Sequence, residues 1–259
     1  MSLIAASRRC FIASLGGSLG ALLFSGCAFA AGTAKIATVV WIGYGPFYIA
    51  DQLDLFKKSG VKVSMQMFQD PALIPPAITG GTVDGGLITY DQVISSVGKG
   101  STMKVVMPID HSNGGDAIVA MGEGKKFHVI YSSKDAPGMI TDVLVFKGEY
   151  IKKNPAVVKA LIQGYIDGLG YMKKNPAEAA KLIGKVMGIS DKEVMEQLPT
   201  VYNPVPGEFA KVFDKSTAST SLHVSGAIIS KILKSKGEIK TIPKIEDTMD
   251  TSIAMSMIK

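Results

Sequence analysis

The chain has 259 residues, of which 47% are hydrophobic and 19% are charged, with 28 Lys and Arg against 22 Asp and Glu. This composition excludes an intrinsically disordered chain, and no apolar run reaches the roughly 18 residues of a membrane-spanning helix. Only two cysteines, Cys10 and Cys27, are present, which excludes a disulfide framework and a cysteine-based zinc site.

The first thirty residues have the composition of an export signal. Residues 1–31 contain no acid, the only arginines of the chain are Arg8 and Arg9, and the apolar stretch 11–24 follows them. We therefore predict a signal peptide over residues 1–30. Residues 7–12 resemble a twin-arginine motif, and an ordinary secretory signal that happens to contain two arginines is the alternative.

Two cleavage sites compete in this segment. The small residues at 28–31 favour cleavage after Ala30, which gives a soluble exported protein. Residues 24–27 resemble a lipoprotein cleavage site, which would leave Cys27 lipidated and the protein anchored to a membrane. Either route predicts a periplasmic location.

Removal of the signal lowers the formal net charge from +6 to +4, because residues 1–30 hold two arginines and no acid. The lysines that remain are scattered, and no arginine is left for bidentate contacts with bases or phosphates. We therefore expect no nucleic-acid partner.

The first half of the exported chain alternates strands and helices. A buried strand over 36–42 ends in the loop Gly43-Tyr44-Gly45-Pro46, and a helix then runs to Gly60. Further strands are predicted at 61–67, 83–89 and 104–109, with a short helix over 70–81 and another over 90–97. Short alternating units of this kind indicate an α/β fold with a parallel sheet covered by helices.

The second half is mainly helical after two predicted strands at 129–132 and 143–146. Helices are expected over 155–174, 176–188 and 221–236, and Ser190 with Glu193 forms a capping box that begins another. The sequence Lys-Lys-Asn-Pro-Ala occurs at both 152–156 and 173–177. We interpret this recurrence as shared helix-boundary chemistry, because a solenoid needs three or more copies.

Signals for catalysis are weak. Asp110 and His111 are adjacent and would make an acid–base pair, but no nucleophile accompanies them. His111, His128 and His223 are isolated from one another, so we predict no metal site, no cofactor and no enzymatic activity.

The loops at the strand ends are better candidates for binding a ligand. In an open parallel sheet, ligands bind beyond the carboxyl ends of the strands. Glycines in these loops allow close approach, helix N-termini offer free N–H groups, and aromatic and hydroxyl side chains offer walls and hydrogen bonds. Tight turns with aromatic side chains in the core are the alternative. The predicted ligand-binding residues are Gly43, Tyr44, Gly45, Pro46, Phe47, Thr89, Tyr90, Asp91, Ser112, Asn113 and Gly114.

Three segments in order resemble one protein family. Residues 40–50 (VWIGYGPFYIA), 80–86 (GGTVDGG) and 132–138 (SSKDAPG) are similar to the first loop, the third-strand entry and the return crossover of periplasmic substrate-binding proteins of ABC importers. The group in question serves nitrate, sulfonate, taurine and thiamine-pyrimidine precursors. The resemblance implies a type II periplasmic binding fold, with two α/β lobes that close on a small ligand and deliver it to a permease in the inner membrane.

The chain departs from that family between Ala120 and Met121. A segment like the outgoing crossover passes almost directly into one like the returning crossover, whereas the resemblance implies most of a second lobe between them. About a dozen residues stand there, fewer than the roughly 30 of one βαβ unit. We therefore expect the first part of lobe 1 at 31–120, a remnant of lobe 2 at 121–131, and the return to lobe 1 with C-terminal helices at 132–259.

The resemblance implies an extracytoplasmic solute-binding protein for a small anion or a small heteroaromatic compound. The absence of arginine from the exported chain removes a bidentate anion clamp. One alternative is a truncated relative that does not close on its ligand, or that dimerises through the face left by the missing lobe. The other is an enzyme on the same fold, for which Asp110 and His111 are the only hint.

Overall fold

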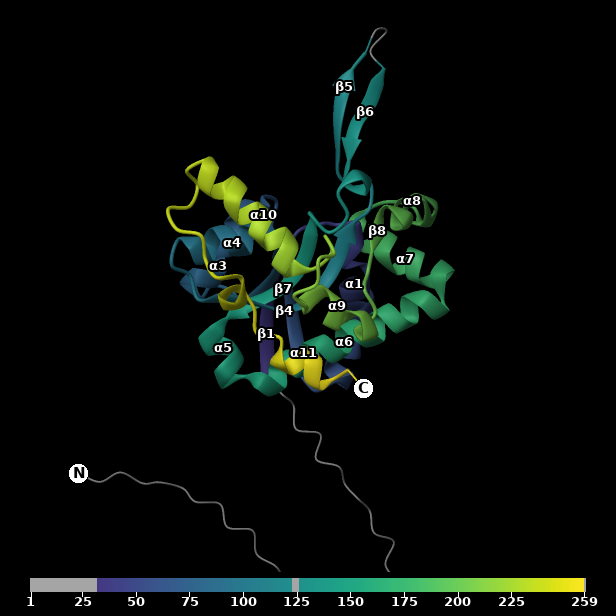
Figure 1. Cartoon of the computed structure of the whole chain (residues 1–259). Helices are drawn as coiled ribbons and strands as arrows, with labels where there is room; N and C mark the ends of the chain where they lie inside the picture. Colours follow the sequence, from purple (N-terminus) through teal and green to yellow (C-terminus); the bar gives the residue numbers. More distant parts are fainter. Residues whose placement is uncertain (1–31, 123–125, 259) are drawn as a thin grey trace, which may run out of the picture.

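The computed structural model describes residues 32–122 and 126–258 (Figure 1). The predicted signal peptide, its cleavage sites and Cys27 lie outside the described residues. Within the described ranges, no helix is both long and apolar enough to cross a bilayer.

A six-stranded sheet forms the centre of the molecule. Its strands are, in spatial order, β2 (Val61–Met67), β1 (Gly32–Thr38), β3 (Gly85–Thr89), β7 (Thr141–Lys147), β4 (Met103–Ser112) and β8 (Val201–Tyr202). β1 pairs in parallel with β2 and β3, whereas β7 runs antiparallel to both β3 and β4. The predicted α/β lobe is confirmed, and the parallel strands β1–β4 receive the returning strand β7 between β3 and β4.

Helices cover the sheet on both sides (Figure 1). One group packs around β1 and β2, and another packs against β3, β4 and β7. The first group is α1 (Gly45–Gln52), α2 (Leu55–Lys58), α6 (Pro155–Lys174), α7 (Pro176–Met187) and α8 (Asp191–Gln197). The second is α3 (Ile74–Gly80), α4 (Tyr90–Gly98) and α10 (Leu222–Ser235), while α9 (Phe209–Phe213) and α11 (Ser252–Ser256) contact β4 and α5 (Gly148–Lys153) follows β7.

The strand predicted at 36–42 ends earlier, at Thr38. The cause is the Tyr48 hydroxyl on α1, which donates to Val39 O and accepts from Trp41 N–H, each at 3.1 Å. These are the backbone groups that a longer strand would give to its neighbours. The chain therefore leaves the sheet at Val39 and places Trp41 above the strand ends.

The helix predicted between Phe47 and Gly60 is two helices, α1 and α2. They are separated at Asp54, whose φ of 54° lies in the left-handed region and interrupts the helical backbone. The later helices agree with the sequence, and α6 and α7 begin at Pro155 and Pro176 as expected.

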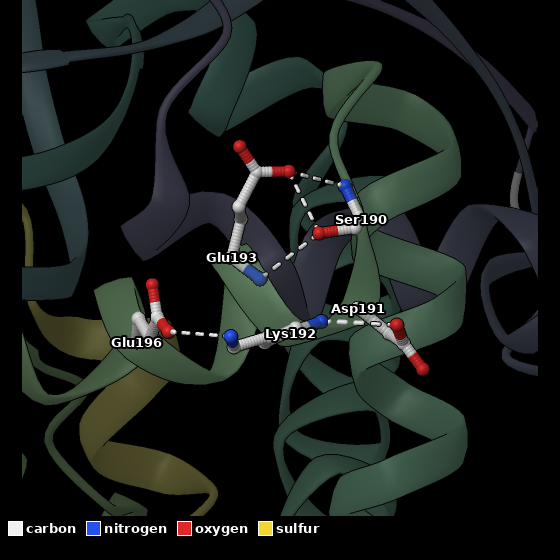
Figure 2. Close-up of polar contacts among 5 residues, drawn as sticks. All are labelled: Ser190, Asp191, Lys192, Glu193 and Glu196. Atoms are coloured by element: carbon white, nitrogen blue, oxygen red, sulfur yellow. Dashed lines mark hydrogen bonds and ion pairs between the residues drawn. The ribbon is translucent and has the colours of Figure 1, made fainter.

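The capping box at the start of α8 is confirmed. Ser190 Oγ accepts from Glu193 N–H, and the Glu193 carboxylate accepts from both Ser190 N–H and Ser190 Oγ (Figure 2). At the two recurring Asn-Pro boundaries the asparagine acts differently. Asn154 and Asn175 donate their side-chain amides back to the carbonyl four residues earlier, closing the helix that ends there.

A separate two-stranded hairpin projects from the lobe (Figure 1). It consists of β5 (Ala117–Met121) and β6 (Phe127–Ser132), which pair antiparallel. It occupies the stretch where the resemblance implies a second lobe, between the exit of the chain from β4 and its return in β7. The domain boundaries proposed at 121 and 131 both fall inside this hairpin.

Candidate functional site

A cavity of about 130 Å³ lies at the ends of the central strands. The chain enters this region at the ends of β1 and β3 and at the start of β7, so the sheet topology gathers distant residues there. The lining residues are Val39, Val40, Trp41, Tyr44, Pro71, Leu87, Ile88, Thr89, Gln92, Asp116, Ile140 and Asp142. In the described part of the chain, this lining contains three acids or amides and no lysine.

Two buried carboxyl groups lie at the site, Asp142 in the lining of the cavity and Asp110 bonded to its Trp41 wall. Asp110 on β4 and Asp142 on β7 are cross-strand partners, and their residues are 0% and 3% exposed. Tyr44 donates its hydroxyl to Asp142 Oδ1 at 2.5 Å, and Trp41 donates Nε1–H to Asp110 Oδ2 at 3.1 Å. The lone tryptophan of the chain thus joins the cavity wall to the acid pair.

Burial changes the protonation of this pair. Burial, and next the negative charge of Asp142, raise the pKa of Asp110 well above its ordinary value. Burial also raises the pKa of Asp142, and the hydrogen bond from Tyr44 opposes that rise. Two adjacent carboxylates cannot both ionise readily in a dry environment, so the pair retains a proton into the neutral range.

Gly43 makes room for the acid pair. A Cβ placed on Gly43 would lie 1.7 Å from Asp110 Oδ2. The loop carbonyl of Gly43 in turn accepts from Asn203 Nδ2 at 2.8 Å, and Asn203 also donates to Ile109 O at 3.0 Å. The absence of a side chain at Gly43 therefore serves contact within the protein, with the carboxyl group of Asp110.

Buried side-chain oxygens without a hydrogen-bond partner gather around the cavity. Four buried side-chain polar atoms lack a partner in the described residues, and three of them are Gln92 Oε1, Asp110 Oδ1 and Asp116 Oδ2. Gln92 and Asp116 line the cavity, and Asp110 bonds to its Trp41 wall. Because unpaired buried polar atoms cost free energy, their concentration in one place marks a polar region at this end of the sheet.

The first predicted loop lies partly at the site. Tyr44 lines the cavity with its hydroxyl turned to Asp142. Phe47 is fully buried and packs against Phe56 and Tyr165, with ring centroids 5.7 and 5.2 Å apart, so it is a core residue away from the cavity. Gly45 and Pro46 are also buried, where α1 approaches α7 and α6.

Only one residue of the second predicted loop, 89–91, lies at the cavity. Thr89 lines the cavity at the end of β3. Tyr90 is buried under α10, and its hydroxyl is hydrogen-bonded to Thr248 Oγ1 at 2.7 Å. Asp91 is exposed and lines a different groove of 560 Å³ between α3, α4 and α10.

The residues of the third predicted loop, 112–114, form hydrogen bonds within the protein. Ser112 is buried, and its Oγ lies 2.8 Å from Ser133 Oγ, which also accepts from Gly114 N–H at 2.6 Å. Asn113 is exposed, and its backbone N–H donates to Thr200 O at 2.8 Å. These contacts fasten the base of the hairpin rather than face the 130 Å³ cavity.

The acid–base pair suggested by the sequence is not a pair in the structure. Asp110 bonds to Trp41, whereas His111 Nδ1 lies 2.8 Å from Thr141 Oγ1. Burial lowers the pKa of His111 to about 4, so its imidazole is neutral at physiological pH. Adjacent strand residues point to opposite faces, which explains the separation.

Sequence reasoning missed the residues that define the site. Trp41, Gln92, Asp116 and Asp142 were not among the predicted ligand-binding residues, and Asp110 was considered only for catalysis. One signal was available, because Asp142 directly precedes the fully apolar strand sequence Val-Leu-Val-Phe. An acid at the start of a strand buried on both faces indicates a buried carboxyl group with a local role.

Comparisons with known proteins agree with this fold. The family model described as NMT1/THI5 like matches residues 41–120, which include the Trp41 loop, β3 and β4. No curated protein sequence matches the chain.

Solved structures of ABC import proteins share the fold at low sequence identity. The ligand-binding component of an ABC-type import system from Staphylococcus aureus, with zinc bound, has a TM-score of 0.66 and 12% identity over 88% of this chain and 99% of its own. The periplasmic aliphatic sulphonate binding protein SsuA from Escherichia coli has a TM-score of 0.65 and 10% identity, covering 85% and 92%. The periplasmic nitrate-binding protein NrtA from Synechocystis PCC 6803 has a TM-score of 0.61 and 11% identity, covering 86% and 87%.

The resemblance inferred from the sequence is therefore confirmed, and the chain has the periplasmic-binding-protein fold. The identities of 10–12% carry the fold alone, and the ligands in those descriptions belong to those proteins. In this chain, no group of three or more His, Cys, Asp or Glu side chains gathers into a metal site within the described residues.

Proposed function

We propose that this chain is an extracytoplasmic solute-binding protein of an ABC-type importer and that it is not an enzyme. The fold, the family-model match over 41–120 and the export-signal composition of residues 1–30 support this proposal. Its partners are then a small-molecule ligand and a permease in the inner membrane, and its location is periplasmic. We propose export by the twin-arginine route as a soluble protein, with lipid anchoring through Cys27 as the alternative.

The observation that carries the ligand assignment is the acidic and amide lining of the 130 Å³ cavity. Asp116, Asp142 and Gln92 line it, and within the described residues no lysine does. An anion such as nitrate or a sulfonate would approach carboxyl groups without a compensating cation, which is unfavourable in a poorly solvated site. Of the two ligand classes indicated by the sequence, we therefore favour the heteroaromatic one, in a form that carries N–H donors.

The size of the cavity is compatible with one small ring. A dry cavity of about 150 Å³ holds a benzene molecule, and this one measures about 130 Å³. The indole of Trp41 and the ring of Tyr44 form part of its wall, and Asp142 lies beneath. An amino-substituted pyrimidine would stack on such a wall and donate its amino hydrogens to the acids.

Titration with small probes tests this proposal through the fluorescence of Trp41, the one tryptophan of the chain. 4-Aminopyrimidine should change the emission saturably and raise the melting temperature, whereas nitrate and ethanesulfonate should do neither. Tyr44→Phe should weaken the response, because it removes the hydroxyl that orients Asp142. Tyr202→Phe is the matched control, since Tyr202 is half-exposed and bonds to Glu208. A response to the anions alone would overturn the ligand class.

The hairpin supports a second candidate, a relative that does not close on its ligand. Residues 117–132 provide two strands where the resemblance implies a lobe, so one side of a bound ring stays in contact with water. Such a half-site binds weakly, because less of the ligand surface is buried. Saturation by 4-aminopyrimidine only at millimolar concentration would favour this candidate, and submicromolar saturation by a monomer would exclude it.

A further inference from the structure

The hairpin β5–β6 exposes an unusual amount of apolar surface. Sixteen large hydrophobic side chains are exposed in the described residues, and seven of them lie within this one hairpin. They are Ile118, Val119, Met121, Phe127, Val129, Ile130 and Tyr131, with 47% to 68% of each residue exposed. Contiguous exposed apolar surface of this kind marks an interaction site, whereas the remaining nine are distributed over the lobe.

The strand register divides these side chains between two faces. Val119 is paired with Val129 and Met121 with Phe127, and paired residues of antiparallel strands share a face. Val119 and Met121 are two residues apart and so also share it. These four residues form one continuous patch, which we call the tip patch. Ala120 and its partner His128 lie on the opposite face, together with the paired residues Ile118 and Tyr131.

We propose that the tip patch is a dimer interface, in which the hairpins of two copies of this chain pack face to face about a two-fold axis. The shape of the patch supports a second copy as the occupant. The long side chains of Met121 and Phe127 lie next to the turn, and the short side chains of Val119 and Val129 lie nearer the lobe. When two such hairpins pack antiparallel, the long pair of one lies over the short pair of the other, so the surface is complementary to itself.

The charge of the hairpin agrees with self-association. Neither β5 nor β6 contains a lysine, arginine, aspartate or glutamate. Two copies therefore meet without like-charge repulsion in the patch. A strand pair that remains alone in water commonly carries charged side chains along its edges, whereas here the charged residues Asp116 and Lys126 lie just outside the two strands. A membrane-surface element would combine an apolar face with a basic one, which these strands also lack.

The area that the tip patch can bury reaches the lower limit for a specific contact. At on the order of 200 Å² per fully accessible side chain, the exposed fractions of the tip patch amount to roughly 500 Å² per copy. Two copies would then bury about 1,000 Å² in total, the lower limit for a specific interface. Neighbouring side chains on the same face add to this value. A lone two-stranded hairpin is marginally stable in water, so the contact also stabilises the hairpin itself.

The experiment is a measurement of molar mass by light scattering on the purified full-length protein and its variants, over a range of micromolar concentrations. The wild-type protein should be a dimer. Val129→Lys should be a monomer, because it places a charge in the tip patch. Ala120→Lys is the matched control on the opposite face and should stay dimeric. Far-UV circular dichroism should show a folded lobe in both variants, since the hairpin lies outside the core of the lobe.

A complementary pair of variants tests the arrangement itself. Phe127→Lys and Val129→Glu should each be monomeric alone, and their mixture should form a heterodimer, because Phe127 of one copy lies over Val129 of the other. A wild-type protein that is monomeric at every concentration would overturn the proposal. So would a Val129→Lys variant that remains dimeric, or a mixture that stays monomeric. None of these results depends on ligand binding.

Discussion

Asp110 and Asp142 lie opposite each other on β4 and β7, both buried, and neither takes part in a salt bridge within the described residues. Each carboxyl group is held instead by an aromatic donor, Trp41 for Asp110 and Tyr44 for Asp142. Burying two acids without a cation is costly for folding. A cost of this kind beside a cavity is typical of a site kept for binding.

The first prediction concerns stability and pH. The pKa values of Asp110 and Asp142 are raised by burial, so the folded state holds protons that the unfolded state has released. The contribution of this pair to the free energy of unfolding should therefore be largest at acidic pH, and it should be lost as pH rises above the ordinary aspartate range into the neutral range. The difference in melting temperature between the wild-type protein and a variant of the pair, measured from pH 5 to pH 8, isolates this contribution from His111, whose lowered pKa acts in the opposite direction.

The matched variant is Asp110→Asn, which keeps an oxygen for Trp41 and supplies N–H donors to Asp142. It should raise the melting temperature at pH 8 and flatten its dependence on pH. A gain of 1 kcal/mol corresponds to roughly 2–4 °C in a domain of this size. Asp91→Asn, at an exposed position, should change neither quantity. Equal pH profiles for wild type and Asp110→Asn would contradict the prediction.

The second prediction concerns the pH dependence of binding. Loss of the shared proton gives the acid pair its negative charge, so the affinity for a ligand with N–H donors should increase as pH rises from 5 to 8. Titration of Trp41 fluorescence with 4-aminopyrimidine at several pH values measures this. The probe itself is protonated at the acidic end, so the dissociation constant is calculated for each protonation form. If the affinity for the neutral probe and the affinity for the protonated probe were both independent of pH, the acid pair would not contact the ligand.

The third prediction concerns Gly43. Replacement by alanine places a methyl group against Asp110 Oδ2, at 1.7 Å in the present geometry, so either the loop or the carboxyl group must move. Gly43→Ala should lower the free energy of unfolding by about 3 kcal/mol, the upper range for overpacking. Gly80→Ala is the control, because nothing lies within 4 Å of a Cβ at that position. Denaturant unfolding of both variants gives the comparison, and similar stabilities would show that the loop adapts without cost.

The fourth prediction concerns the start of α8. Ser190→Ala removes the acceptor for Glu193 N–H and should cost about 1 kcal/mol (Figure 2). Lys192→Ala, in the same turn, removes only the exposed contact of Lys192 with Glu196 at 3.9 Å and should cost under about 0.5 kcal/mol. Thermal unfolding distinguishes the two. Equal losses of stability in the two variants would mean that the capping box does not stabilise α8.

The sequence predicted the lobe well because local rules dominate there. Pro155 and Pro176 begin helices, the Ser190 box caps one, and alternation over 61–67 matches β2. The sequence could not show that β1 stops at Thr38. The cause is the Tyr48 hydroxyl, which accepts a hydrogen bond from the backbone N–H of Trp41. Such a contact exists only once the loop and α1 are folded together.

The candidate site was predicted by region rather than by residue. The rule that ligands bind beyond strand ends located Tyr44 and Thr89 correctly on the cavity wall. The aromatic character of Phe47 and Tyr90 was misleading, because both pack in the core. In the sequence, Asp142 is separated from Asp110 by the whole hairpin. Their pairing therefore depends on the register of β7 against β4. Local pattern carries no information on that register.

The same two strands that hold the acid pair also carry the hairpin. β4 runs from Asp110 through Ser112 into β5, and β6 returns past Ser133 toward Asp142, with the Ser112 and Ser133 hydroxyls bonded to each other between them. The hairpin and the acid pair are therefore consecutive parts of the same two chain segments, joined across the Ser112–Ser133 contact. A partner bound to the hairpin would lie on the same two segments as the carboxyl groups of the site.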